Sequence, residues 1–113
     1  MAIKTEANRA GEFLLSEANG SRSRESVVLT GGNYQAGQIL GVVTASDKYT
    51  EYDAGASDGT ETAVAILYAP VDASTSDQSA LVIHRDAEVS TELLVGLDSD
   101  AQTNLKANGI IAR

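Results

Sequence analysis

The fold is decided by residues 37–85, which read GQILGVVTASDKYTEYDAGASDGTETAVAILYAPVDASTSDQSALVIHR. Short apolar runs, rich in β-branched and aromatic residues, alternate here with links that contain Asp, Gly, Ser or Pro, which is the pattern of successive β-strands. The links are too short to hold a helix of ordinary length. Gly41, inside one apolar run, indicates a bulge or the close approach of another backbone. Strands are expected at residues 26–30, 38–44, 48–52, 62–68 and 80–85.

The composition predicts a single domain with a thin core. At 113 residues the chain has the usual size of one domain. Hydrophobic residues make up 42% of the sequence, but aromatic residues only 4%, and Trp is absent. The core therefore has to be built from Val, Ile, Leu and Ala. We expect a partner subunit to complete it.

The charge and the absence of cysteine exclude several classes of function. Sixteen acidic and eight basic side chains give a net charge of -8, which repels the phosphates that dominate nucleic-acid affinity. Without cysteine there are neither disulfides nor thiolate metal sites. No apolar run approaches the about 18 residues of a membrane span, and no leader is recognisable. We expect neither a nucleic acid nor a membrane as partner, and synthesis in a cytoplasm.

Beyond residue 86 the apolar period changes from that of a strand to that of a helix. Residues 89–97 predict a short helix or helical turn, and the pair at 98–99 offers an N-cap for a terminal helix. Ala101 and Leu105 would lie on the inner face of this helix. Gly109 stands where a left-handed residue ends a helix, so the last residues are expected to fold back onto the body.

No motif in the sequence predicts catalysis. The triplet at 84–86, His-Arg-Asp, also occurs in protein-kinase catalytic loops, but the chain is too short for a kinase and lacks its glycine loop. Asp53, Asp58 and Glu61 have calcium-type oxygens, but their spacing matches no calcium loop, so loop solubility explains them better. No serine stands in a Gly-x-Ser-x-Gly elbow. The sequence predicts a protein that is not an enzyme and holds neither a metal nor a cofactor.

The N-terminal segment allows two interpretations. Residues 1–11 lack an apolar period and are expected to be mobile, whereas 13–15 (Phe-Leu-Leu) form a short apolar run. Such a run is either a first strand that covers the core or part of an arm that docks on a partner. Residues 18–25 (ANGSRSRE) favour a hinge, because Asn-Gly is a strong turn signal and the following residues are small, polar or basic.

Five segments, in order along nearly the whole chain, resemble the lambda-type head decoration proteins of tailed bacteriophages: FLLSEANGSRSRESVVL (13–29), GQILGVVT (37–44), KYTEYDAGASDGTETAVAIL (48–67), IHRDAEV (83–89) and LKANGIIAR (105–113). The most specific parts are the Gly-Gln-x-Leu-Gly start, the Ala-Ser-Asp-Gly-x-x-x-Ala loop, the Arg-Asp-Ala-Glu-Val step and the closing Gly-Ile-Ile-x-Arg. The chain departs from the family at 50–51 and 54–55, where members often have proline.

The resemblance implies a mainly β fold with short helices (α+β), a small β-clip-like domain that forms a homotrimer. Residues 24–113 would form this domain and residues 1–23 a flexible capsid-binding arm that is dispensable for folding. The arm residues expected to contact the capsid are Glu12, Phe13, Leu14, Leu15, Ser16, Arg22 and Arg24.

The resemblance also implies a place and a role. The trimer would bind the major capsid protein on the outer surface of the expanded shell, at three-fold and quasi-three-fold positions, and stabilise it against DNA pressure. Synthesis would take place in the host cytoplasm. Two other classes stay open: a small trimeric ligand-binding domain or enzyme that uses loop 53–61, and a fibre or baseplate accessory protein.

Overall fold

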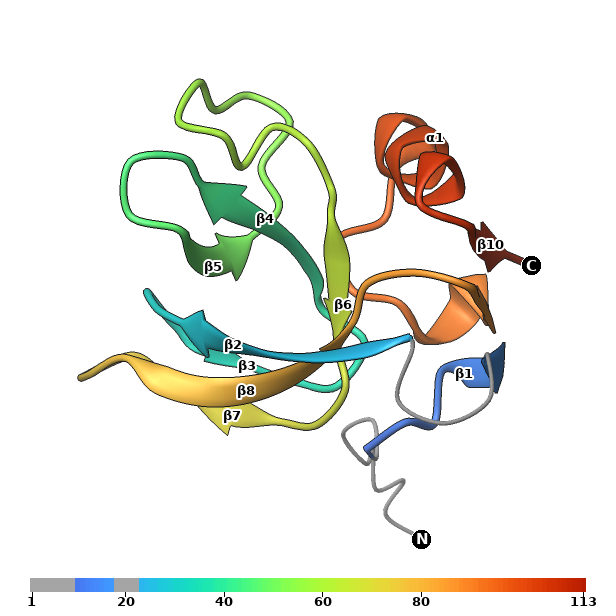
Figure 1. Ribbon diagram of the computed structural model, residues 1–113, viewed down its shortest axis with the longest axis horizontal. Coiled ribbons are helices and arrows are strands. Elements are labelled where there is room, and N and C mark those ends of the chain that lie inside the picture. The colour runs from blue at the N-terminus through green and yellow to red at the C-terminus, as the bar shows by residue number, and fades with distance from the viewer. Residues whose placement is uncertain (1–9, 18–22) are drawn as a thin grey trace, which may run out of the picture.

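The computed structural model of the chain describes residues 10–17 and 23–113 (Figure 1). Its body is a closed barrel of five strands, in the order β2-β5-β4-β6-β8. These strands are β2 (Arg24–Leu29), β4 (Ile39–Val43), β5 (Lys48–Glu51), β6 (Ala65–Leu67) and β8 (Gln78–Ile83). β8 pairs antiparallel with β2 along the whole length of β2, so these two strands form the longest ladder of the barrel.

A second unit lies beside the barrel and contains the C-terminus (Figure 1). It is a three-stranded sheet in the order β1-β9-β10, in which β1 is antiparallel and β10 parallel to the central strand. A helix packs next to β10, and a 3-10 turn follows β9. The elements are β1 (Leu14–Glu17), β9 (Ala87–Val89), η1 (Thr91–Leu93), α1 (Ser99–Ala107) and β10 (Ile110–Ala112). A separate two-stranded sheet joins β3 (Asn33–Tyr34) to β7 (Val71–Asp72).

The mainly β fold predicted from the sequence is confirmed, and so are the predicted strands near β2, β4, β5 and β8. The strand predicted at residues 62–68 is shorter, because only Ala65–Leu67 pair as a strand. The Ala63 N–H instead donates to the side-chain oxygen of Asn104 at 3.0 Å, which turns the chain toward α1. All three residues of β6 are buried, as the apolar character of both strand faces predicts.

Two buried clusters share one wall of the barrel. Successive residues of a strand point to opposite faces, so β6 places Ile66 in the cluster beneath α1 and Leu67 in the cluster inside the barrel. Likewise, β8 places Ile83 in the cluster beneath α1 and Val82 in the cluster inside the barrel. Both cores are built mainly from Ile, Leu, Val and Ala, as the composition requires.

The terminal helix has the ends that the sequence predicts. Of the two candidate caps, Asp98 is the N-cap, and its carboxylate accepts the Ala101 N–H at 2.7 Å. Ala101 and Leu105 are buried. Gly109 has a φ of +79°, a conformation that favours glycine, and a Cβ there would lie 2.8 Å from the Asp86 carboxylate, which would have to move. The turn predicted at 89–97 is the single turn η1.

Candidate interaction site

The described part of the predicted arm is folded onto the body. β1 pairs with β9, and the preceding Phe13 is completely buried in the cluster that also contains Val89 and Ile110. The Phe13 carbonyl accepts the Ser90 N–H at 2.7 Å. Of the two interpretations of residues 13–15, Phe13 fits the first, a strand segment that covers the core, because its side chain has an apolar site in its own protomer. The expected domain boundary after Ser23 therefore divides this core.

The other predicted arm residues fall into three groups. Leu15 is 55% exposed, and Glu12 and Ser16 are exposed beside it. Leu14 is half-buried against the core. Arg22 and the predicted hinge at 19–20 lie outside the described residues. Of the apolar run, the structure thus leaves Leu15 available for contact with a partner.

Arg24 holds β1 to the barrel. Its Nε donates to Glu17 at 3.0 Å, and its guanidinium carbon lies 4.5 Å from the centre of the Tyr68 ring. The hydrogen bond from Arg24 lowers the pKa of Glu17 below its usual value. The Gly11 N–H also donates to the Tyr68 carbonyl at 2.8 Å. Arg24, predicted as a partner contact, therefore binds residues of its own chain.

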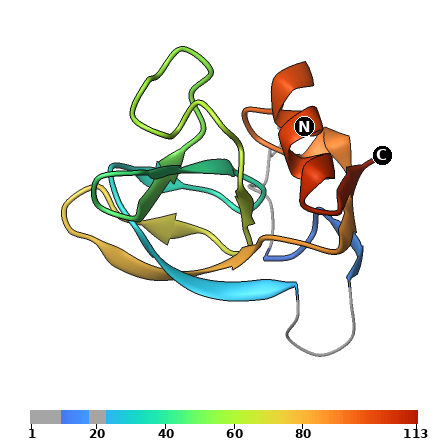
Figure 2. The same ribbon diagram turned by 45° about the horizontal axis from the view of Figure 1, so that its top comes forward.

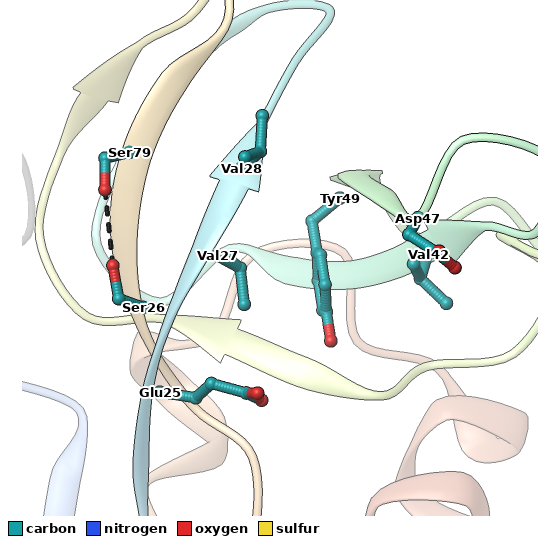
Figure 3. Close-up of a pocket in the computed structure, with 8 residues that line it drawn as sticks. All are labelled: Glu25, Ser26, Val27, Val28, Val42, Asp47, Tyr49 and Ser79. Atoms are coloured by element: carbon teal, nitrogen blue, oxygen red, sulfur yellow. Dashed lines mark hydrogen bonds between the residues drawn. The ribbon is translucent and has the colours of Figure 1, made fainter.

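A groove of about 540 Å³ opens on the barrel where β2 faces β4 and β5 (Figure 3). Figure 3 shows the Tyr49 ring between Val27 and Val42, with the carboxylates of Glu25 and Asp47 on either side of it. Val28 is 44% exposed at the groove. The groove is lined by Glu25, Ser26, Val27, Val28, Val42, Asp47, Tyr49 and Ser79. It combines an apolar lining with an acidic rim.

The groove exists because two neighbouring strands of the barrel, β2 and β5, are paired at one end only. We call the boundary between these two strands the seam. β2 pairs with β8 along its length, but with β5 only at Leu29 and Tyr49, where the strands run parallel. The Thr30 N–H donates to the Tyr49 carbonyl at 2.8 Å and closes that end. From Leu29 back toward Arg24, β2 diverges from β5 (Figure 2). Residues of β2, β4 and β5 line the groove on this side of the barrel.

The electrostatic environment of the groove is negative. The pKa of Tyr49 is raised, first by its burial and then by the charges of Glu25 and Asp47. Asp47 has a φ of +57°, a left-handed conformation that Asp and Asn tolerate better than most residues. Both carboxylates therefore contribute negative charge at the groove. No sequence pattern predicts the groove, because the groove depends on how far β2 and β5 separate.

The candidate metal-binding carboxylates stabilise their own loop. Asp53 accepts the Gly55 N–H at 3.0 Å, Asp58 accepts the Thr60 N–H at 3.1 Å, and Glu61 accepts the Gly59 N–H at 2.8 Å. The two Asp contacts are turn hydrogen bonds, in which a short side chain accepts the N–H two residues further on. Across residues 10–17 and 23–113, no group of three or more His, Asp or Glu side chains is arranged to hold a metal ion.

His84, the single histidine, also has a structural environment. Its Nδ1 lies 3.7 Å from a carboxylate oxygen of Glu25, and its N–H in the main chain donates to the Ser23 carbonyl at 2.9 Å. Within the part of the chain that the structure describes, no helix has the length and apolar character needed to cross a membrane.

The small β-barrel thus has two surfaces that a partner could contact: the groove with its acidic rim, and the exposed Leu15 on the edge strand β1. The chain matches the family model of the bacteriophage lambda head decoration protein D over residues 3–113 and belongs to this family. The protein is therefore a structural protein of the virion capsid from a family that is not one of enzymes, which confirms the resemblance seen in the sequence. No protein with a curated description matches the chain.

Proposed function

We propose that the protein forms a homotrimer that binds the major capsid protein on the outer surface of the expanded shell, at three-fold and quasi-three-fold positions, and stabilises the shell against the pressure of the DNA. The family supports decoration of the head. The thin core, with 4% aromatic residues, supports a subunit that buries more apolar surface against copies of itself. The protein is made in the host cytoplasm and acts on the virion.

The observation that carries the attachment mechanism is the exposed Leu15 on β1. β1 lies at the edge of its sheet, with β9 on one side. An exposed strand edge can take a strand from another chain, and main-chain hydrogen bonds then add affinity to the contacts of alternate side chains. Leu15 supplies the apolar contact and Glu12 and Ser16 the polar ones, within an arm that comprises residues 1–23.

Three arms on one trimer make this attachment strong. The shell segment that adds to β1 has to be ordered, at a cost of about 1–2 kcal/mol per residue in backbone entropy, so a single contact binds weakly. Once one arm is bound, the other two are at a high local concentration around a three-fold site. Phe13 contributes from within the protomer, where it anchors the end of the arm.

The alternative of an enzyme or ligand-binding domain has less support. Its site would be loop 53–61, whose carboxylates are already engaged in turn hydrogen bonds. A fibre or baseplate protein would bind another component of the virion, whereas the family points to the head.

The test is to mix the purified protein with expanded and unexpanded shells of its phage and to examine both by electron microscopy. We expect density at three-fold positions on expanded shells alone, and sedimentation of the free protein as a trimer at micromolar concentration. A monomer, or equal binding to both shells, would contradict the proposal.

A further inference from the structure

The open seam of the barrel exposes main-chain hydrogen-bonding groups of β2. The Ser23 carbonyl faces β8, because it accepts the His84 N–H at 2.9 Å. In an antiparallel pair these groups alternate in direction along the strand, and the register from Arg24 to Leu29 is continuous. The N–H and C=O of Ser26 therefore point away from β8 and into the seam. Among residues 10–17 and 23–113, no main-chain partner is found there.

The side chains around this edge suit an extended peptide. Val27, Val42 and the Tyr49 ring form the apolar lining, and the exposed Val28 extends it to the surface (Figure 3). A strand that adds to an open edge gains hydrogen bonds from its main chain and places alternate side chains in such a groove. The site thus offers the two components of strand addition, which are main-chain groups that can form hydrogen bonds and an apolar groove for side chains.

The negative charge of the groove favours an incoming strand that contains basic residues. Glu25 and Asp47 stand on either side of Tyr49, so a lysine or arginine of the incoming strand would be attracted and an acidic strand repelled. Another copy of this chain is poorly matched, because it has a net charge of -8. Several of its cations also bind carboxylates of their own protomer: Arg24 with Glu17, Lys48 with Asp77 and Arg113 with Glu88.

We propose that the seam between β2 and β5 accepts an extended segment of the capsid shell that contains lysine or arginine, and that this segment pairs with the main chain of Ser26. The inference rests on the proposed function, since it takes the shell as the partner. It adds a second contact, on the barrel rather than on β1, at which the decoration protein again supplies a strand edge and the shell supplies the strand.

The test removes the main-chain donor of the seam. In Ser26→Pro the lost N–H is one that faces away from β8, and proline is tolerated at edges of this kind. Ser26→Ala is the matched control, because it keeps the N–H and removes only the hydroxyl that contacts Ser79. We expect Ser26→Pro to bind expanded shells at least about tenfold more weakly than the wild type, and Ser26→Ala to bind them equally well.

A second pair of variants tests the charge. Glu25→Gln and Asp47→Asn each remove one negative charge and keep the shape, and Asn suits the left-handed conformation at position 47. Both variants should bind expanded shells more weakly, and their affinity should depend less on salt than that of the wild type. Hydrogen exchange of the peptide that contains Ser26 should also slow when wild-type protein decorates the shell.

The outcomes separate this inference from the proposed function. If the wild type decorates expanded shells and Ser26→Pro, folded and trimeric, does so equally well, the seam assignment is wrong and decoration stands. If Ser26→Pro becomes a monomer while Ser26→Ala stays a trimer, the seam holds a second copy, which also overturns the assignment. Failure of the wild type to bind expanded shells would reject the proposed function and this inference together.

Discussion

The Tyr52 hydroxyl donates a hydrogen bond to the Asp98 carboxylate at 3.0 Å, and the same carboxylate caps α1. One acidic side chain therefore joins the end of β5 to the start of the helix. Because the partner is charged and Tyr52 is buried, this hydrogen bond is expected to be stronger than one between neutral groups.

Removing either partner should destabilise the protein. We expect Tyr52→Phe to lower the free energy of unfolding by about 1.5 kcal/mol, and Asp98→Ala by about 2 kcal/mol because it also removes the cap. Ser99→Ala is the control, since Asp98 rather than Ser99 caps the helix. Denaturant unfolding measures all three, and a loss in Ser99→Ala as large as in Asp98→Ala would contradict the assignment of the cap.

The same contact predicts a dependence of stability on alkaline pH. Burial, followed by the hydrogen bond to Asp98, raises the pKa of Tyr52 from 10.0 to about 12. The folded protein then keeps a proton that the unfolded chain releases, so stability is complete below pH 10 and falls as the pH rises toward about 12. Because the pKa of Tyr49 is raised too, the measurement is the difference between the wild type and Tyr52→Phe. Equal slopes above pH 10 would refute the prediction.

Phe13 and Leu15 are two residues apart, but their truncation should affect different properties: protein stability for Phe13 and binding to shells for Leu15. Phe13→Ala removes a completely buried ring and is expected to cost about 3–5 kcal/mol of stability. Leu15→Ala changes a side chain that is 55% exposed and should cost less than about 0.5 kcal/mol, while it weakens binding to expanded shells. Thermal unfolding and shell binding, measured on both variants, check this. A fully stable Phe13→Ala would show that the segment is not part of the core.

Gly109→Ala should destabilise the protein by about 1 kcal/mol or more, because its φ is +79° and the new Cβ would meet Asp86. Gly55→Ala is a matched control: the nearest atom to a Cβ there is 3.6 Å away, in a side chain. If both variants unfold at the same denaturant concentration, the helix does not depend on a left-handed residue at its end.

Local features were predictable from the sequence. The strands of residues 37–85 follow from apolar runs between turn residues, and the cap and end of α1 follow from Asp98 and Gly109. Gly41 was expected to mark a bulge or a close approach, and a Cβ there would lie 2.6 Å from the Thr60 Cα. For the strands and the helix ends, a few neighbouring residues determine the outcome, whereas at Gly41 the glycine itself signals the approach of a distant segment.

Long-range features could not be predicted in the same way. β9 pairs with β1 and with β10, which are distant in sequence, and no local pattern specifies such partners. The burial of Phe13 and the single parallel contact between Leu29 and Tyr49 depend on this assembly. Both parts of the proposed interaction site, the exposed Leu15 and the open seam, are consequences of tertiary structure.

The wall formed by β6 and β8 has a mechanical consequence. Because Ile66 and Ile83 face one core while Leu67 and Val82 face the other, neither core can loosen without disturbing the strands that support its neighbour. A pull on β1 reaches this wall through Phe13, which lies in the same cluster as Ile66 and Ile83. Load applied at the anchoring strand should therefore pass through this wall from one core to the other.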